Sequence, residues 1–147
     1  MSQPPGRILA IDPGRVRIGL AISDPTRILA SGLDTLRSKG RRQDAEMLAS
    51  LVREHEVVEI VVGSPRNLDG SPSNMTEFAE RMAEDLRHAT GLPVHLWDER
   101  LSSAQAERAL IQGDIRREDR REMRDRVAAI LILQGYLDWR SSGASPA

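Results

Sequence analysis

Hydrophobic and polar positions alternate along the first forty residues with the period of β-strands. An apolar run lies within residues 7–12, which end in the turn signal Asp12-Pro13-Gly14, and in residues 17–23 apolar side chains recur at every second position. A third alternating stretch spans residues 28–36. Side chains two positions apart lie on the same face of a strand, so the pattern predicts three strands. Because only short proline-containing turns separate these strands, we expect an antiparallel meander.

After residue 40 the spacing of apolar residues becomes that of helices. Residues 41–55 carry apolar side chains three and four positions apart, which predicts a helix. The β-branched run V-V-E-I-V-V-G at 57–63 is typical of a strand buried on both faces. By the same criteria we expect a strand over 94–97 and helices over 74–90, 102–112 and 120–140. Two of these helices are expected to begin at capping pairs, Asn74 with Glu77 and Ser102 with Gln105.

The order of these elements predicts the fold class. Strands separated by helices pair in parallel through right-handed crossovers, whereas the first three strands pair antiparallel. The sequence therefore predicts an α/β fold with a mixed five-stranded sheet flanked by helices. We expect the 147 residues to form a single domain, with a core from about residue 7 to 138 and a flexible tail at 141–147.

Charge and composition narrow the classes of function. The chain has 21 basic and 22 acidic residues, so any binding to a polyanion must come from local patches. All but one of the basic residues are arginines, which bind phosphate bidentately. Cysteine is absent, which excludes disulfides, thiolate metal sites and cysteine nucleophiles. Without a signal pattern or a long apolar run, we expect a cytoplasmic protein with no membrane partner.

Acidic residues follow two of the predicted strands. Asp12 ends the first strand, and Asp98 and Glu99 end the last one. Parallel strands present their carboxyl ends at one edge of a sheet, so these side chains can converge there. Each also has a structural interpretation. Asp12 precedes Pro-Gly as turn-initiating aspartates do, and Asp98 or Glu99 can pair with Arg100.

A fourth acidic residue heads the apolar face of the last predicted helix. Asp125, Ala128, Ala129, Ile132 and Tyr136 follow one another at helical spacing. Asp125 could simply form a surface ion pair with a neighbouring arginine, but the apolar stripe that it heads is expected to face the sheet. Carboxylates gathered at one edge repel one another unless cations are present, and oxygen ligands select Mg²⁺ or Mn²⁺. Pairs of such ions are commonly used by enzymes to catalyse phosphodiester hydrolysis.

Four segments carry a resemblance to a known family. They are I-L-A-I-D-P-G-R-V-R-I-G-L-A-I-S-D at 8–24, V-V-G-S-P-R-N-L-D-G-S at 61–71, D-E-R-L-S-S at 98–103 and D-R-V-A-A-I-L-I-L-Q-G-Y-L at 125–137. Their order and spacing resemble the YqgF family across nearly the whole chain. Members of that family are assigned to Holliday junction resolution and to pre-16S ribosomal RNA processing. One position departs, since Met123-Arg124 reverses the usual order of a basic and an apolar residue.

The resemblance implies a ribonuclease H-like fold and a Mg²⁺- or Mn²⁺-dependent nuclease. It implies Asp12, Glu99 and Asp125 as catalytic metal ligands. Asp98 is an alternative to Glu99, although adjacent strand residues point to opposite faces and only one can face the metals. Arginines beside these motifs are the expected nucleic-acid contacts, namely Arg15, Arg17, Arg66, Arg100, Arg117, Arg121 and Arg124.

The sequence leaves the substrate and the assembly open. Branched DNA, in recombination and repair, and pre-16S ribosomal RNA, in ribosome biogenesis, both remain candidates. A symmetric four-way junction has two equivalent cuts and favours a homodimer, whereas RNA processing needs none.

Two other functions compete with an endonuclease. An adaptor could bind nucleic acid or ribosome-assembly partners through its arginines without catalysis, and unchanged activity in an Asp12 mutant would favour it. A nucleotide binder of the actin and sugar-kinase type resembles the D-P-G-R-V-R-I-G segment. That site needs a second lobe, for which this chain is too short. ATP turnover without nuclease activity would favour this alternative.

Overall fold

The centre of the protein is a five-stranded mixed sheet. The computed structural model describes residues 6–67, 69–101 and 117–143, with the side chains of 117–122 excepted. The strands are β1 (Arg7–Asp12), β2 (Arg17–Ser23), β3 (Ala30–Arg37), β4 (Val57–Ser64) and β5 (Val94–Asp98), in the spatial order β3-β2-β1-β4-β5. Strands β1, β2 and β3 pair antiparallel, while β4 pairs in parallel with both β1 and β5. The predicted mixed sheet is confirmed.

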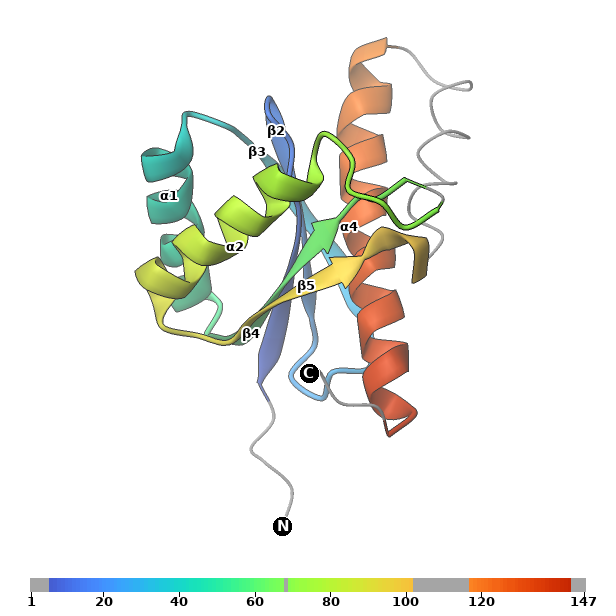
Figure 1. Ribbon diagram of the computed structural model, residues 1–147. Coiled ribbons are helices and arrows are strands. Elements are labelled where there is room, and N and C mark those ends of the chain that lie inside the picture. Colours follow the sequence, from blue (N-terminus) through green and yellow to red (C-terminus); the bar gives the residue numbers. More distant parts are fainter. Residues whose placement is uncertain (1–5, 68, 102–116, 144–147) are drawn as a thin grey trace.

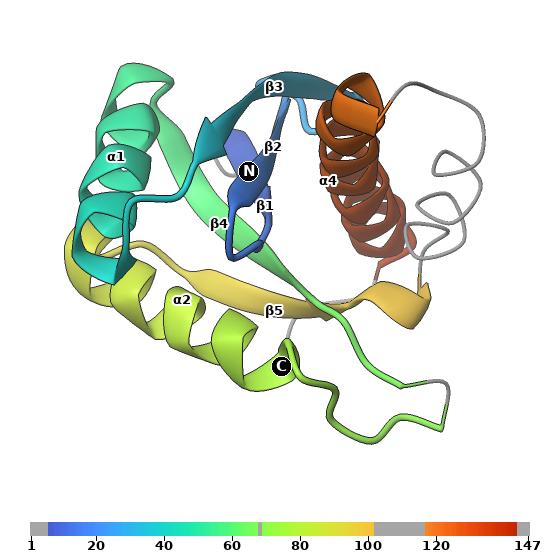
Figure 2. The same ribbon diagram turned by 90° about the horizontal axis from the view of Figure 1, so that it is seen from above.

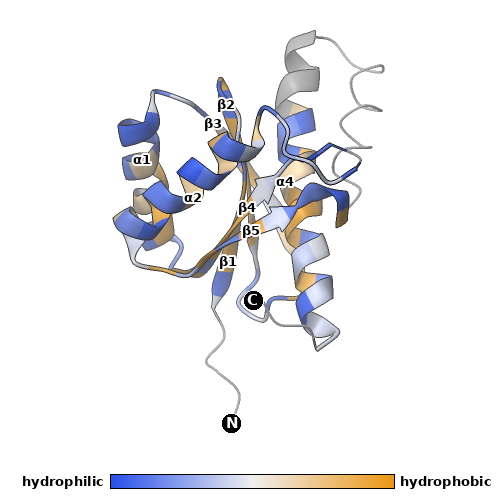
Figure 3. Cartoon of the chain, viewed as in Figure 1, coloured by the Kyte–Doolittle hydropathy of each residue, from blue (hydrophilic) through white to orange (hydrophobic). Residues whose placement is uncertain are grey.

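Helices cover both faces of this sheet (Figure 1). They are α1 (Arg41–Glu54), α2 (Thr76–Thr90) and α4 (Arg117–Ser141), and a short 3-10 helix η1 (Glu99–Leu101) follows β5. Seen from above, α1 and α2 lie on one side of the strands and α4 lies on the other (Figure 2). The outward surfaces of α1 and α2 are hydrophilic, whereas the strands between the layers are hydrophobic (Figure 3).

Alternation along each strand divides the core into two clusters. Leu9, Ile11 and Leu20 belong to the cluster beneath α1 and α2, while Ile8 and Ala10 belong to the cluster beneath α4. Successive strand residues point to opposite faces, so odd and even positions of β1 supply different layers. Position along a strand therefore decides which helix a side chain meets.

A group of polar side chains anchors the C-terminal part of α4 to the sheet. The Tyr136 hydroxyl donates to the Glu59 carboxylate on β4, and Arg140 Nη1 donates to Glu59 Oε2 at 2.9 Å. Burial and this hydrogen bond raise the pKa of Tyr136, which keeps its hydroxyl a donor. His95 Nε2 on β5 lies 3.6 Å from Glu59 Oε2. This group fixes how α4 is rotated about its own axis.

The boundaries predicted for the helices and strands agree with the structure within a few residues, but the predicted N-terminal cap of α2 does not. Helix α2 begins at Thr76, and its N-cap residue Met75 makes no side-chain cap, so the predicted Asn74 cap is wrong. Ser73 and Thr76 bond instead to each other and to the Pro65 carbonyl, which ties the helix to the preceding loop. The predicted helix over 102–112 lies outside the described residues. Helix α4 ends at Ser141, so the first residue of the expected tail is helical.

None of the described helices is both long and apolar enough to cross a membrane.

Candidate active site

Asp12 lies at the carboxyl end of the central strand, on the face covered by α4. It continues the alternation of Ile8 and Ala10, whose side chains pack in the α4 cluster. Only 5% of Asp12 is exposed. A carboxylate in this position is held by a rigid strand and surrounded by packed side chains rather than by bulk water.

Gly19 on β2 makes room for a second carboxylate beside Asp12. It is the register partner of Asp12, and a Cβ at Gly19 would lie 2.3 Å from the Asp125 carbonyl oxygen and 3.2 Å from the Asp12 Cβ. The backbone of α4 therefore rests directly on β2 at this point. Asp125 is only 9% exposed as a result. Glycine is required at residue 19 because any side chain would displace the helix that carries Asp125.

Gly63 plays the corresponding role on β4 for a third carboxylate. A Cβ at Gly63 would lie 3.1 Å from Glu99 Oε2 and 2.5 Å from Ile132 Cδ1 of α4. Glu99 begins η1 immediately after β5 and is completely buried. It thus lies on the same side of the sheet as Asp12, beneath α4.

The three predicted metal ligands, Asp12, Glu99 and Asp125, share one corner of the fold. All three are oxygen ligands and all are at least nine-tenths buried, which suits a hard divalent ion. The glycines at 19 and 63 leave the space above the sheet to these carboxylates and to α4. Within the described ranges, however, no three acidic or histidine side chains are close enough to hold one ion. The residues fit a metal in chemistry and location without forming a closed ligand set.

Arginines border this corner. A hollow of about 490 Å³ is lined by Arg15, Arg17 and Arg124 together with Asp125. Arg124 Nε lies 3.5 Å from Asp125 Oδ1. An anionic backbone in this hollow would meet three guanidinium groups next to one of the acidic side chains.

Asp98 and Glu99 are adjacent but have different surroundings. Asp98 forms an ion pair with Arg100, whose Nη2 donates to Asp98 Oδ2 at 2.7 Å. The side-chain hydrogen bond from Arg100 holds the pKa of the Asp98 carboxyl below its usual range. Asp98 is thus a partly exposed residue paired with Arg100, whereas Glu99 is completely buried on the side of the sheet that α4 covers. This difference favours Glu99 over Asp98 as the metal ligand.

Two further predicted nucleic-acid contacts lie beside the loop that follows β4. Arg66 Nη1 donates to the Gly70 carbonyl at 3.2 Å. The Arg100 guanidinium packs against Gly70, since a Cβ at residue 70 would lie 3.2 Å from its terminal nitrogens. The loop is further closed by Asp69, which accepts from the Ser71 N–H and hydroxyl. Arg117 and Arg121 belong to the first turns of α4, where side chains lie outside the description, so their role stays a prediction.

Sequence reasoning missed Gly19 and Gly63. Their signal was available, because both are odd-numbered strand positions in phase with residues that face α4, such as Ala21 and Val61. A glycine in a strand interior marks a close approach of another backbone. What the sequence could not indicate is which element approaches.

Comparison with known proteins agrees with these motifs. Residues 6–139 match the RuvX family, described as Holliday junction resolvase. A "Putative pre-16S rRNA nuclease" of Koribacter versatilis is 47% identical over 135 residues, which cover 92% of this chain and 88% of that protein. A protein of the same name from Dictyoglomus turgidum is 45% identical over 132 residues, covering 90% and 94%.

Solved structures show the same fold. The RuvC protein of T. thermophilus, in complex with a Holliday junction substrate, superposes with a TM-score of 0.60 at 14% identity, covering 97% of this chain and 99% of that one. A second T. thermophilus RuvC structure gives a TM-score of 0.57 at 15% identity. At these identities the likeness concerns the ribonuclease H-like fold alone. The family follows from the sequence match over nearly the whole chain, and this protein belongs to the RuvX family, which the motifs indicated under the name YqgF.

Proposed function

We propose that this protein is a divalent-metal-dependent endonuclease that hydrolyses phosphodiester bonds in structured nucleic acid. One observation carries the proposal: Asp12, Glu99 and Asp125, from three separate motifs, are buried between α4 and the sheet at one corner of a ribonuclease H-like fold. Burying several carboxylates together is costly without a cation. A divalent ion held by these side chains would offset their mutual repulsion and supply the chemistry of phosphodiester hydrolysis.

The three carboxylates would hold Mg²⁺ or Mn²⁺ from β1, η1 and α4. When bound, such ions activate water and stabilise the leaving oxygen of a phosphodiester. In the reaction, the water oxygen forms a new bond to phosphorus while the bond from phosphorus to the leaving sugar oxygen breaks. Arg15, Arg17 and Arg124 would hold the phosphate backbone at the hollow beside Asp125. These contacts position the strand and carry no base sequence information.

Two substrates are supported by different comparisons. The relatives at 45–47% identity are named for pre-16S rRNA, whereas the family description and the RuvC complex concern Holliday junctions. We infer that a substrate of either kind is recognised through shape and phosphate position. A four-way DNA junction and an RNA transcript that spans the 5′ end of 16S rRNA should therefore be offered at matched enzyme concentration.

The assay should include Mg²⁺, Mn²⁺, Ca²⁺ and EDTA with each substrate. We expect cutting with Mg²⁺ or Mn²⁺, little with Ca²⁺ because its looser coordination positions water poorly, and none in EDTA. Linear duplexes of the same sequences serve as the control for structure. Strong cleavage in EDTA would reject the metal site. Binding without cleavage under every condition would favour the adaptor alternative, and ATP turnover without cleavage would favour the nucleotide-binding alternative.

A further inference from the structure

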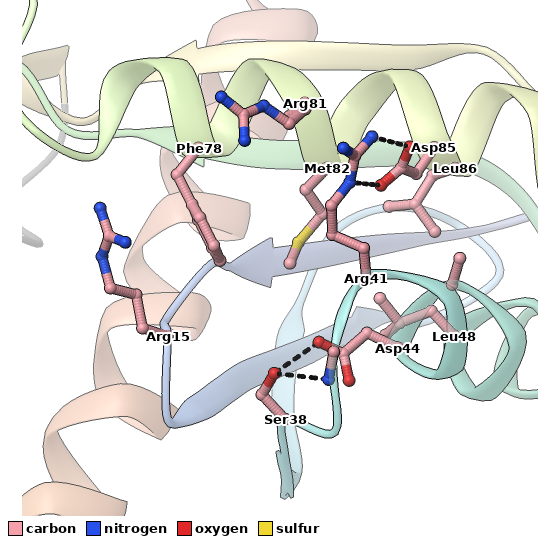
Figure 4. A pocket seen from close by; sticks show the side chains of 12 residues that line it. Arg15, Ser38, Arg41, Asp44, Leu48, Phe78, Arg81, Met82, Asp85 and Leu86 are labelled. Carbon is pink, nitrogen blue, oxygen red and sulfur yellow. Dashed lines mark hydrogen bonds and ion pairs between the residues drawn. The ribbon is translucent and has the colours of Figure 1, made fainter.

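A second hollow lies on the opposite side of the sheet from α4. It has a volume of about 350 Å³ and opens between α1, α2 and the loop that joins β1 to β2 (Figure 4). That volume lies within the range of pockets that take small organic groups, roughly 300–1,000 Å³. None of the four sequence motifs predicted it, and the proposed carboxylate site does not include it.

The hollow has an apolar floor and one aromatic wall. Leu48 of α1 and Met82 and Leu86 of α2 are buried beneath it, and the Phe78 ring stands at the end nearest the β1–β2 loop (Figure 4). Phe78 is the only phenylalanine in the chain. A flat apolar group placed here would contact the ring of Phe78 and the side chains below it.

Charge at the rim favours an anionic ligand. The two lining acids are already engaged, since Asp85 accepts two hydrogen bonds from Arg41 at 2.9 and 3.0 Å, and Asp44 accepts from the Ser38 hydroxyl at 2.6 Å. The Arg15 guanidinium carbon lies 5.3 Å from the centre of the Phe78 ring. Within the part of the chain described, Arg15 forms no ion pair. The Arg15 charge is therefore not neutralised by a carboxylate of the described residues, and its guanidinium lies over one face of the Phe78 ring.

Arg15 also joins this hollow to the proposed active site. It lines the pocket with Phe78, and it lines the hollow that contains Asp125 and Arg124. Its position in the chain is three residues after Asp12, on the loop that leaves the central strand. A strand whose phosphate is held at Arg15 would thus have its scissile region on one side and the pocket on the other.

We propose that this pocket receives one unstacked base of the substrate strand, which stacks on Phe78 while Arg15 holds an adjacent phosphate. This proposal rests on the proposed function, because it assumes that the strand passes the carboxylates. A base supplies the flat apolar face that fits the pocket, and its phosphate supplies the negative charge that fits Arg15. The pocket then distinguishes substrates with an unpaired or easily unpaired base near the cut from continuous duplexes.

The test combines an enzyme variant with substrates that lack one base. The parent and Phe78→Leu are assayed on a series of cleavable substrates in which each nucleotide near the cut is replaced in turn by an abasic residue. Leucine keeps an apolar side chain and removes the stacking ring. For the parent we expect one position at which base removal weakens binding about tenfold, consistent with the loss of one base–aromatic stack. For Phe78→Leu the same base removal should change binding less than twofold, because that stack is already lost.

Replacing an alanine by leucine at two positions of the α1 and α2 layer provides a second variant and its control. Ala45→Leu fills the pocket from α1 without removing a side chain, and should abolish the same position-specific effect. Ala89→Leu adds the same volume at an exposed position of α2 outside the pocket and should behave like the parent. Thermal melting of each variant checks that it is folded.

The outcomes separate this proposal from the proposed function. If the parent cuts its substrate but no position shows an effect that depends on Phe78, the base pocket is wrong and the nuclease stands. If the parent neither binds nor cuts, the proposed function fails and this proposal fails with it. Binding of free AMP that is lost in Phe78→Leu, with unchanged effects of base removal, would assign the pocket to a nucleotide and overturn the proposal.

Discussion

The two faces of the sheet are made from the same five strands but are packed for different purposes. Beneath α1 and α2, the strands present large aliphatic side chains such as Ile11, Ile18 and Leu20, all fully buried. Beneath α4, apolar residues such as Ile8 and Trp97 pack as well, but β1 continues from Ala10 to the acidic Asp12 at its carboxyl end. Both faces therefore bury hydrocarbon, and the α4 face in addition admits a helix backbone closely enough to bury carboxylates.

This difference teaches how stability and chemistry share a small domain. Burial of hydrocarbon stabilises a fold by roughly 25 cal/mol per Å². Buried carboxylates contribute nothing of that kind and repel one another. The α1 and α2 face can therefore supply the stability that the acidic end of the α4 face lacks. Substitutions on the two faces should consequently separate loss of activity from loss of stability.

The largest effect on activity is expected from Asp125→Asn, on the α4 face. The change is nearly isosteric and removes one negative charge from the acidic corner. Cleavage should fall by about 10²-fold or more, as when one strong electrostatic contact is removed from a preorganised site. The melting temperature without metal should stay level or rise, since one member of a repelling group is gone. Added Mn²⁺ should then stabilise the variant less than the parent.

Asp34→Asn is the matched control for that change. Asp34 is fully exposed and forms an ion pair with Arg126 at 3.0 Å, so its loss should leave stability and cleavage nearly unchanged. Initial rates and melting curves of both variants make the comparison. If Asp125→Asn cuts like Asp34→Asn and gains as much from Mn²⁺ as the parent, Asp125 has no part in the reaction.

Leu20→Ala tests the other face. Leu20 is fully buried in the cluster beneath α1 and α2. Truncation of such a residue costs about 2–5 kcal/mol of unfolding free energy. Cleavage per folded molecule should stay near the parent value, because the acidic corner lies across the sheet. Urea unfolding and rates below the transition measure the two quantities. A large loss of rate in the folded variant would mean that the faces are not independent.

Gly19→Ala tests the close approach that joins strand and helix on the α4 face. The new methyl would meet the backbone carbonyl of Asp125, so α4 must shift. Overpacking of this kind costs about 1–3 kcal/mol, and cleavage should also fall because the shifted helix carries Asp125. Gly32→Ala on β3 is the control, since its methyl would meet side-chain atoms of Arg126 and Ile130 rather than the backbone of α4. Equal results for the two glycines would refute the special role of residue 19.

The smallest effect is expected from Asp98→Asn. Asp98 is paired with Arg100 near the surface, so its loss should cost about 0–1 kcal/mol. Cleavage should change little, whereas Glu99→Gln should reduce it as strongly as Asp125→Asn. Rates for the two neighbouring variants decide which carboxylate serves the reaction. The reverse ranking would transfer the role to Asp98.

Periodicity was sufficient to predict the sheet, and motifs were sufficient to place Asp12 and Asp125 on the correct elements. The bounds of β1 follow from an unbroken apolar run, as expected for a strand buried on both faces, and those of β2 follow from alternation. The role of Gly19 depends on where α4 crosses β2, which is a tertiary contact between segments about a hundred residues apart. The pocket beside Phe78 depends in the same way on the gap between α1 and α2. A local sequence pattern contains no information about where α4 crosses β2 or how far α1 lies from α2.

The hydrogen bond from Tyr136 to Glu59 limits where residues can be inserted into α4 or deleted from it. Asp125 and Tyr136 lie on one face of α4 about three turns apart, and each is fixed against the sheet, at Gly19 and at Glu59. Inserting or deleting one residue between them would rotate one end by about 100° relative to the other. Either the acid or the tyrosine would then leave its partner. A substitution between residues 126 and 135 leaves this spacing unchanged, whereas insertions and deletions in this stretch of α4 are expected to abolish function.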